Sequence, residues 1–326
     1  MKQYTSLYFV GAGGIGMSAL VRYFLAKGYK VAGYDRTQSP LTTELKTEGL
    51  EIVYEESVES IPDYCRNPET TLVVYTPAIP ASHAGLVYFR EHSFRVVKRA
   101  ELLGLITQSS KGLCFAGTHG KTTTSSMAAH IFHESPIGCN AFLGGILRNY
   151  NSNLILSEQS PFTVIEADEY DRSFHWLHPY MAVVTATDPD HLDIYGTEEA
   201  YLESFARFTS LIQPGGCLIM KKGIKLVPSV KENVKIYTYS ARDGGDFHAG
   251  NIRIGDGTIV FDFVMPEGSV ADIELGVPVE INIENAVAAM AIAWLNGVSG
   301  DDMRRAMASF KGAKRRFEFW VKRPDR

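Results

Sequence analysis

Residues 113–124 restrict the possible folds of this chain more than any other segment. A short apolar run, LCFA, leads into GTHGKTTT, and a helical pattern then continues to about residue 133. A buried strand, a glycine loop, a Lys-Thr pair and a helix in this order are typical of a P-loop, whose backbone N–H groups cradle phosphate oxygens. Lys121 would place its charge near the transferring phosphate, and the Thr122 hydroxyl could bind Mg²⁺.

The spacing of this loop differs from the standard G-x₄-G-K-[ST] pattern, because Phe115 stands where the first glycine belongs. A tight strand-to-helix turn capped by a threonine would explain the same residues without any ligand. The adjacent Lys121 and Thr122 favour phosphate binding over that alternative.

A second glycine loop lies near the N-terminus. The apolar run 7–10 precedes GAGGIG at 11–16, a helical pattern follows, and a strand over 30–34 ends at Asp35, 19 residues after the last glycine. This βαβ pattern with G-x-G-x-x-G is typical of nucleotide binding at a helix N-terminus. The motif alone leaves open a dinucleotide, another nucleotide, or glycines that serve only packing.

Two more apolar strands, 162–165 and 181–187, end in polar side chains. Ligand sites in α/β folds lie at the carboxyl ends of strands, so Glu166 and His191 are candidates for metal or phosphate contact. For the acidic residues that follow the strand at 162–165, a solvated acidic turn is the alternative, and it suits Asp171. At neighbouring strand ends, Glu166 and His191 could hold one divalent ion, and together with the lysine loop they indicate a magnesium–nucleotide site.

Composition excludes several classes of protein. The 326 residues suffice for two domains, and 45% hydrophobic with 21% charged residues is ordinary for a globular chain. The balance of 32 Lys+Arg against 37 Asp+Glu lacks the basic surplus of nucleic-acid binders. No stretch approaches the roughly 20 apolar residues that span a bilayer, and the four cysteines form no CxxC pair. We therefore expect a cytoplasmic protein without nucleic-acid partners or membrane insertion.

Six sequence blocks together resemble the Mur ligase family of peptidoglycan synthesis. They occur in the family's order and span nearly the whole chain, and the shortened P-loop is itself the Mur form. The blocks are GAGGIGM at 11–17, GTHGKTTT at 117–124, EADE at 166–169, DPDHLD at 188–193, NIENA at 282–286 and GAKRRF at 312–317.

The resemblance implies a role for each matching residue. Lys121 matches the lysine on the ATP β- and γ-phosphates, and Thr122 matches a Mg²⁺ ligand. Glu166 matches the carboxylate of the second Mg²⁺, and His191 matches the histidine at that same metal. Arg316, rather than its neighbour Arg315, matches an arginine that reaches the phosphates. Lys121, His191 and Arg316 are thus the expected catalytic residues.

The same resemblance implies two sets of binding residues, one for the cosubstrate ATP and one for the UDP-sugar. The expected ATP-binding residues are Gly117, Thr118, His119, Gly120, Lys121, Thr122, Thr123, Asn282 and Asn285. The two asparagines would contact adenine, although Ile281 replaces the family's usual histidine. The expected UDP-sugar-binding residues are Gly11, Gly13, Gly14, Gly16, Met17, Asp35, Thr76, Ala78 and Ile79.

The fold class expected is α/β. A Rossmann-like UDP-sugar-binding domain would cover residues 1–107, and a P-loop ATPase domain with a parallel-sheet core and a β-rich insert at 235–279 would cover 108–314. Residues 315–326 would begin the linker to a third domain that the family has and this chain lacks. We therefore expect the chain to bind nucleotides without completing the reaction alone.

The activity implied is ATP-dependent joining of L-alanine to the carboxyl of UDP-N-acetylmuramate through an acyl phosphate. Residues 97–103 and 177–182 resemble this branch more than the alternative, which adds a tripeptide to the same nucleotide in murein recycling. Two alternatives come from other classes. One is a nicotinamide-dependent oxidoreductase that uses the first glycine loop and Asp35, and the other is a nucleotide sensor without catalysis.

Overall fold

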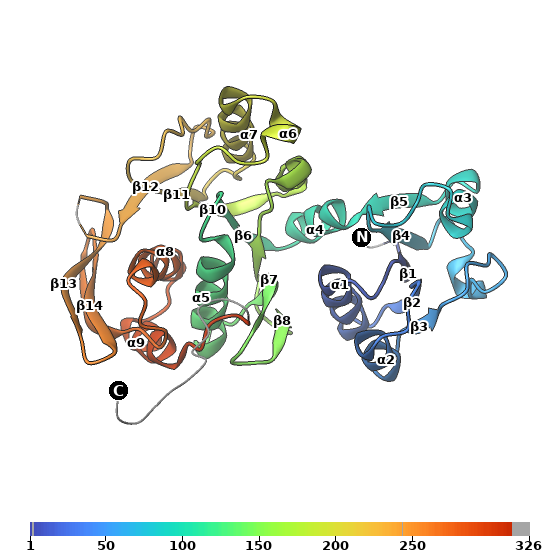
Figure 1. The fold of residues 1–326 in the computed structure, drawn as a ribbon, viewed down its shortest axis with the longest axis horizontal. Coiled ribbons are helices and arrows are strands. Elements are labelled where there is room, and N and C mark those ends of the chain that lie inside the picture. Colours follow the sequence, from blue (N-terminus) through green and yellow to red (C-terminus); the bar gives the residue numbers. More distant parts are fainter. Residues whose placement is uncertain (2, 243, 315–326) are drawn as a thin grey trace. The chain divides into compact units, whose positions relative to one another are not determined.

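The computed structural model describes residues 1, 3–242 and 244–314 (Figure 1). The chain divides into two compact units, Met1–Ile106 and the part from Thr107 onward. Among the helices of the described residues, none is both long and apolar enough to cross a membrane.

The first unit is a five-stranded parallel sheet in the order β3-β2-β1-β4-β5. Its strands are β1 (Ser6–Val10), β2 (Lys30–Tyr34), β3 (Glu51–Val53), β4 (Thr71–Tyr75) and β5 (Arg95–Lys98). Its helices are α1 (Ile15–Ala26), α2 (Pro40–Thr47), α3 (Ala84–Glu91) and α4 (Arg99–Gln108), with a 3₁₀ turn η1 at Asp63–Cys65. Every residue of β1 is buried, because this central strand is covered on both faces. The predicted Rossmann-like arrangement is confirmed.

The second unit contains a ten-stranded sheet in the order β15-β14-β13-β12-β11-β10-β6-β9-β7-β8. Its strands are β6 (Lys111–Ala116), β7 (Asn140–Leu147), β8 (Ser152–Ile155), β9 (Phe162–Glu166), β10 (Pro179–Val184), β11 (Cys217–Lys221), β12 (Lys235–Ser240), β13 (Phe247–Gly255), β14 (Thr258–Met265) and β15 (Gly268–Glu274). The helical segments are α5 (Lys121–Glu134), η2 (Tyr170–Trp176), α6 (Leu192–Tyr195), α7 (Glu198–Ser210), α8 (Ile281–Leu295) and α9 (Gly300–Ser309). The predicted parallel core is confirmed from β7 to β12.

The β-rich region expected at 235–279 is present as β12 to β15, and it continues the main sheet. β12 pairs in parallel with β11, and β13 to β15 then form an antiparallel extension. Figure 1 shows this extension curving past α8 and α9, which lie on the same side as α5. Helix α8 is apolar around most of its circumference and is almost wholly buried against α5 and the curved sheet, which makes it a central element of the core.

The strand order decides how the predicted ligand-binding loops meet. β6 pairs in parallel with both β9 and β10, so its loop lies between the strand ends that carry Glu166 and His191. Those two strand ends were expected to be neighbours, and this expectation is wrong because β6 separates them. β10 also ends at Val184, short of the predicted Thr187, and the Thr185 hydroxyl that follows lies within hydrogen-bonding distance of the carbonyls of Ala116 and His119.

Candidate functional site

The loop after β6 has a backbone that requires two of its glycines. Gly117 has φ of 140° and Gly120 has φ of 84°, both in the region that glycine adopts without strain. A Cβ on Gly117 would also collide with the Thr185 side chain and the backbone of Ala186. Gly120 is the N-cap of α5, so the loop presents the helix N-terminus, where backbone N–H groups and the helix dipole favour an anion.

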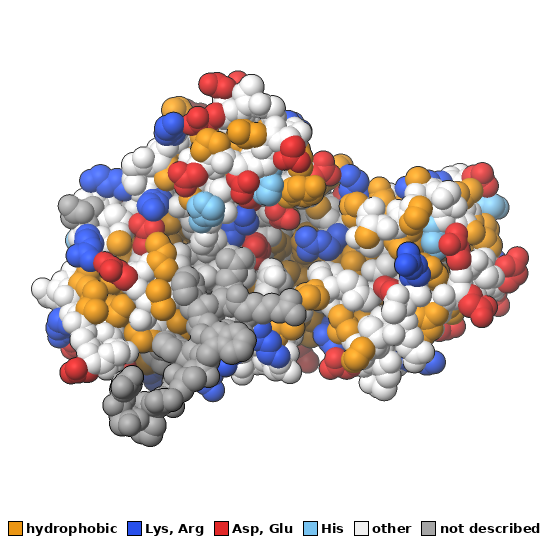
Figure 2. Space-filling view, viewed as in Figure 1, with side chains coloured by type: hydrophobic (Ala, Val, Ile, Leu, Met, Phe, Trp, Pro, Cys, Tyr) orange, Lys and Arg blue, Asp and Glu red, His pale blue; other side chains and the backbone are white. Residues whose placement is uncertain are grey.

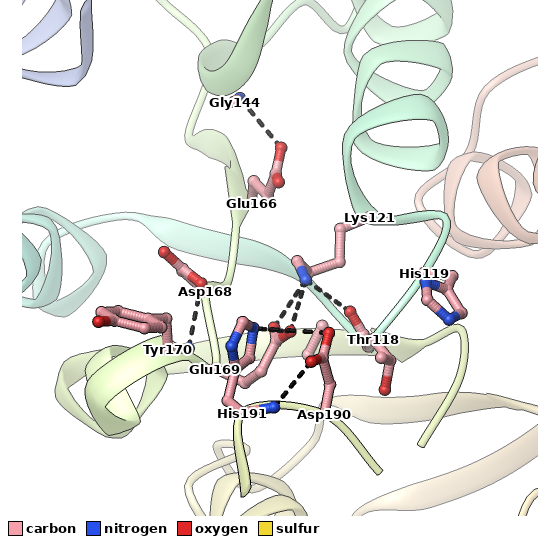
Figure 3. Close-up of polar contacts among 12 residues, drawn as sticks. Thr118, His119, Lys121, Gly144, Glu166, Asp168, Glu169, Tyr170, Asp190 and His191 are labelled. Atoms are coloured by element: carbon pink, nitrogen blue, oxygen red, sulfur yellow. Dashed lines mark hydrogen bonds and ion pairs between the residues drawn. The ribbon is translucent and has the colours of Figure 1, made fainter. Parts of the chain in front are cut away.

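Lys121 begins α5 and is held by two partners (Figure 3). Its Nζ donates to the Gly117 carbonyl at 2.7 Å and lies 2.8 and 2.7 Å from the two carboxylate oxygens of Glu169. The Lys121 side chain is 14% exposed and that of Glu169 only 1%. The ammonium is therefore fixed at the loop by a largely buried ion pair.

Thr122 and Glu166 meet on the other side of the lysine. The Thr122 hydroxyl donates to Glu166 Oε1 at 2.9 Å, and the Gly144 backbone N–H donates to Oε2 at 3.0 Å. Burial raises the pKa of the Glu166 carboxyl, while the Thr122 hydrogen bond and the Lys121 charge oppose the rise. A hydroxyl and a carboxylate oxygen at this distance are hard donors that suit Mg²⁺, which usually takes one or two carboxylates and completes its shell with phosphates and waters.

His191 lies near Glu169 and not beside Glu166, the partner expected from the sequence (Figure 3). Its Nε2 is 4.0 Å from Glu169 Oε1 and 3.7 Å from Asp190 Oδ2, and its ring packs edge-on against Tyr170 at 5.2 Å between centroids. In Figure 3, Glu166 points away from this group toward Gly144. Within the described residues, no set of three or more His, Cys, Asp or Glu side chains is arranged to hold a metal. A metal held by Thr122 and Glu166 would therefore need its remaining ligands from water and substrate.

The other predicted ATP-binding residues differ in accessibility. Thr118 donates its hydroxyl to the Asp188 carbonyl at 2.7 Å, while His119 is exposed and lies apart from the lysine cluster in Figure 3. Asn285 accepts a hydrogen bond from Thr124 at 3.2 Å and donates to Asn282 at 3.1 Å, beneath the first turn of α5. Both asparagines are at least 92% buried, and Thr123 is partly exposed at the loop. Arg316, predicted at the phosphates, and its neighbour Arg315 lie outside the described residues.

The glycine loop of the first unit is contacted by the turn that follows β4. Gly11 has φ of 91°, and a Cβ there would meet Thr76 Cγ2 at 2.5 Å and Ile79 Cγ1 at 3.3 Å. Ala78 lies in the same turn and is exposed. The structure therefore brings the predicted turn to the predicted loop. Of the other predicted residues, Gly14 caps α1, Gly16 lies in its first turn, and Met17 is buried.

Asp35 is used by the loop itself. Its Oδ2 accepts the Gly13 backbone N–H at 2.7 Å, and its Oδ1 accepts that of Thr37 at 3.1 Å. In a dinucleotide site the corresponding acid accepts from the ribose hydroxyl. Here both oxygens of Asp35 already accept backbone hydrogen bonds.

Two residues of these sites were not singled out from the sequence. Glu169 is one of four carboxylates in six residues, and nothing in that spacing shows which one turns toward Lys121. Arg99 begins α4 at the carboxyl end of the parallel sheet, and its Nη1 is 2.8 Å from the place of a Cβ on Gly16. Its position after β5 is the only signal that could have indicated it, because α/β folds bind ligands at that edge.

Comparison with known proteins gives consistent results. The family descriptions "Mur ligase family, catalytic domain" and "Mur ligase middle domain" match residues 6–111 and 115–293. A UDP-N-acetylmuramate–L-alanine ligase of Parabacteroides distasonis is 65% identical over 99% of this chain and 70% of its own length, and one of Phocaeicola vulgatus is 64% identical over 97% and 69%.

Solved structures share the fold at lower identity. A UDP-N-acetylmuramate:L-alanyl-gamma-D-glutamyl-meso-diaminopimelate ligase of Neisseria meningitides aligns with a TM-score of 0.81 at 22% identity, covering 96% of this chain and 100% of that one. A UDP-N-acetylmuramate–alanine ligase of Thermotoga maritima aligns with a TM-score of 0.79 at 24% identity, covering 98% and 72%. The sequence matches, the fold and the loop geometry agree, and the chain belongs to the Mur ligase family.

Proposed function

We propose that this chain binds ATP and UDP-N-acetylmuramate and acts in the ATP-dependent joining of L-alanine to the lactyl carboxyl of that nucleotide. The observation that carries the proposal is 65% identity over 322 residues to a ligase of that name, combined with the lysine, threonine and glutamate side chains gathered at the loop after β6. Because ATP is a cytosolic nucleotide, the reaction would take place in the bacterial cytoplasm.

The reaction activates a carboxylate. A carboxylate oxygen of the sugar attacks the γ-phosphorus of ATP, ADP leaves, and an acyl phosphate forms. The L-alanine amine then attacks the acyl carbon, phosphate leaves, and the amine nitrogen loses a proton. No bond to the protein is needed, so the chain contributes by positioning the reactants and stabilising their charge.

The residues of the second unit fit that task. Lys121 and the N-terminus of α5 would face the β- and γ-phosphates, and the side chains of Thr122 and Glu166 would hold Mg²⁺. Mg²⁺ bound there would neutralise charge on the phosphate oxygens. His191 would lie on the opposite side of the lysine, near Glu169, where the sugar carboxylate or a second cation could approach.

The first unit would hold the uridine nucleotide. The N-terminus of α1, the loop from Gly11 to Gly16 and the Arg99 guanidinium offer N–H donors and positive charge to a diphosphate. One observation weighs against a nicotinamide cofactor: both Asp35 oxygens already accept backbone hydrogen bonds, from Gly13 and from Thr37.

Calorimetry on this chain tests the binding part of the proposal. UDP-N-acetylmuramate should bind more tightly than NAD by orders of magnitude, and a non-hydrolysable ATP analogue should bind with Mg²⁺. Tighter binding of NAD than of UDP-N-acetylmuramate would contradict the assignment of the first unit.

The choice of the added group needs an activity measurement. When the chain is joined to the third domain that the resemblance implies, phosphate release should depend on both UDP-N-acetylmuramate and L-alanine, and the tripeptide L-alanyl-γ-D-glutamyl-meso-diaminopimelate should not replace L-alanine. Faster release with the tripeptide would favour the recycling ligase, whose structure shares this fold. Binding of ATP with no acyl phosphate under any condition would favour a nucleotide sensor.

A further inference from the structure

Glu169 lies at the centre of the loop site but is not among the residues assigned to nucleotide or metal. Its carboxylate contacts the Lys121 ammonium through both oxygens, and the side chain is 1% exposed. The lysine charge that would attract a phosphate is therefore already balanced by a buried acid.

The backbone around Glu169 holds this carboxylate in place. The Glu169 carbonyl accepts hydrogen bonds from the Tyr195 hydroxyl at 2.5 Å and from the Arg172 N–H at 2.9 Å. Two and three residues later, Asp171 and Arg172 have φ of 51° and 55°, in the left-handed region that non-glycine residues rarely occupy. Such strain persists where the surrounding structure fixes it, and it is concentrated at functional sites.

The charges at the loop have a consequence for the ligand. Lys121 and Glu169 form a neutral pair, and the nearby Glu166 adds a negative charge on the other side. The helix N-terminus supplies only about half a positive charge. A triphosphate without its cation would bring about four negative charges into this site, where the side chains of Lys121, Glu169 and Glu166 together carry no net positive charge.

We propose that Glu169 makes the loop selective for the metal-bound form of the triphosphate, by cancelling the Lys121 charge that would otherwise bind metal-free phosphates. Glu169 is on this view a specificity-determining residue that acts through Lys121. The inference rests on the proposed binding of ATP with Mg²⁺ and goes beyond it, because it concerns discrimination between two forms of one ligand.

The test compares two dissociation constants for a non-hydrolysable ATP analogue, one with excess Mg²⁺ and one with EDTA, at equal ionic strength. The dissociation constant with EDTA divided by that with Mg²⁺ is the ratio used below, and a larger ratio means a stronger preference for the metal-bound form. In Glu169→Gln this ratio should fall by at least about tenfold, chiefly because metal-free binding becomes tighter. Asp171→Asn is the matched control, since it removes an exposed carboxylate two residues away in the same turn, and it should leave the ratio within about twofold.

Two further variants separate charge from folding. Lys121→Gln leaves Glu169 without its partner and should raise the ratio, which keeps the proposal testable if Glu169→Gln does not fold. The double variant Lys121→Gln with Glu169→Gln has a neutral pair again, so its ratio should return toward that of the unmodified chain while both affinities fall.

The outcomes distinguish this inference from the function on which it rests. If the unmodified chain binds the analogue with Mg²⁺ and Glu169→Gln leaves the ratio unchanged or raises it, only the role of Glu169 is overturned. If Lys121→Gln fails to raise the ratio, the charge argument is wrong. Absence of any analogue binding to the unmodified chain with Mg²⁺ would overturn the proposed function and this inference together.

Discussion

Replacement of Lys121 by alanine should destabilise the second unit as well as weaken ATP binding. The change leaves the Glu169 carboxylate buried without its ion-pair partner, and such losses are about 3–5 kcal/mol. Because the lysine side chain is 14% exposed, water can partly replace it, and we expect the lower end, about 3 kcal/mol. For a unit of roughly 200 residues this corresponds to a fall in Tm of about 6–12 °C.

The assay is thermal unfolding of the ligand-free chain, with Lys225→Ala as a matched control. Lys225 Nζ lies 2.7 Å from Glu198 Oε1, the same separation as in the buried pair, but the lysine side chain is 74% exposed. Its removal should change stability by less than about 1 kcal/mol. Adding Glu169→Gln to Lys121→Ala should recover at least half of the loss, because the buried charge is gone. Equal effects of Lys121→Ala and Lys225→Ala would refute the reasoning, and loss of UDP-sugar binding without unfolding would contradict the assignment of the two nucleotides to different units.

Three further predictions concern the metal, pH and the first unit. Mg²⁺ with an ATP analogue at about 100 times Kd should stabilise the chain by about 2.7 kcal/mol, which is measured as a rise in Tm. Glu166→Gln should remove most of this rise and His191→Ala less of it, because Glu166 contacts Thr122 and His191 does not. Burial lowers the pKa of His130 to about 4, below the ordinary value of about 6.5, so the unfolded chain takes up the proton first as the pH falls. The stability that neutral His130 contributes is therefore complete above pH 6.5, and about 2–3 kcal/mol of it is lost as the pH falls toward 4. Denaturant titrations at several pH values should show that His130→Gln weakens this pH dependence of the free energy of unfolding, while the exposed His133→Gln does not. Arg99→Ala should weaken UDP-N-acetylmuramate binding in calorimetry by at least about tenfold without changing ATP-analogue binding, because its guanidinium lies at the first glycine loop, and an unchanged affinity would remove this residue from the site.

Figure 2 shows how charged side chains are distributed over one face of the molecule. Lys and Arg side chains are interspersed with Asp and Glu on the face shown, and no broad basic area covers either unit there. This agrees with a chain that has 37 acidic and 32 basic residues.

Local sequence was sufficient to predict those features of the fold that depend on residues close together in the chain. The glycines at 117 and 120 and the adjacent Lys121 and Thr122 indicate a phosphate loop, because backbone conformation and helix N-terminus are determined within a few residues. The apolar runs of β1, β4 and β6 likewise predict buried parallel strands, since a strand covered on both faces has few polar positions.

Tertiary structure alone decided which distant side chains meet. The strand order places β6 between β9 and β10, so Glu166 contacts Thr122 while His191 lies beside Glu169. Four carboxylates within six residues are equivalent by type, and only the path of the chain after β9 buries Glu169 against Lys121. Arg99, at the start of α4, likewise reaches Gly16 although more than 80 residues separate them in the sequence. The physical reason is that turn and helix preferences act over a few residues, whereas ion pairs between separate strand ends depend on sheet order, which local preferences do not encode.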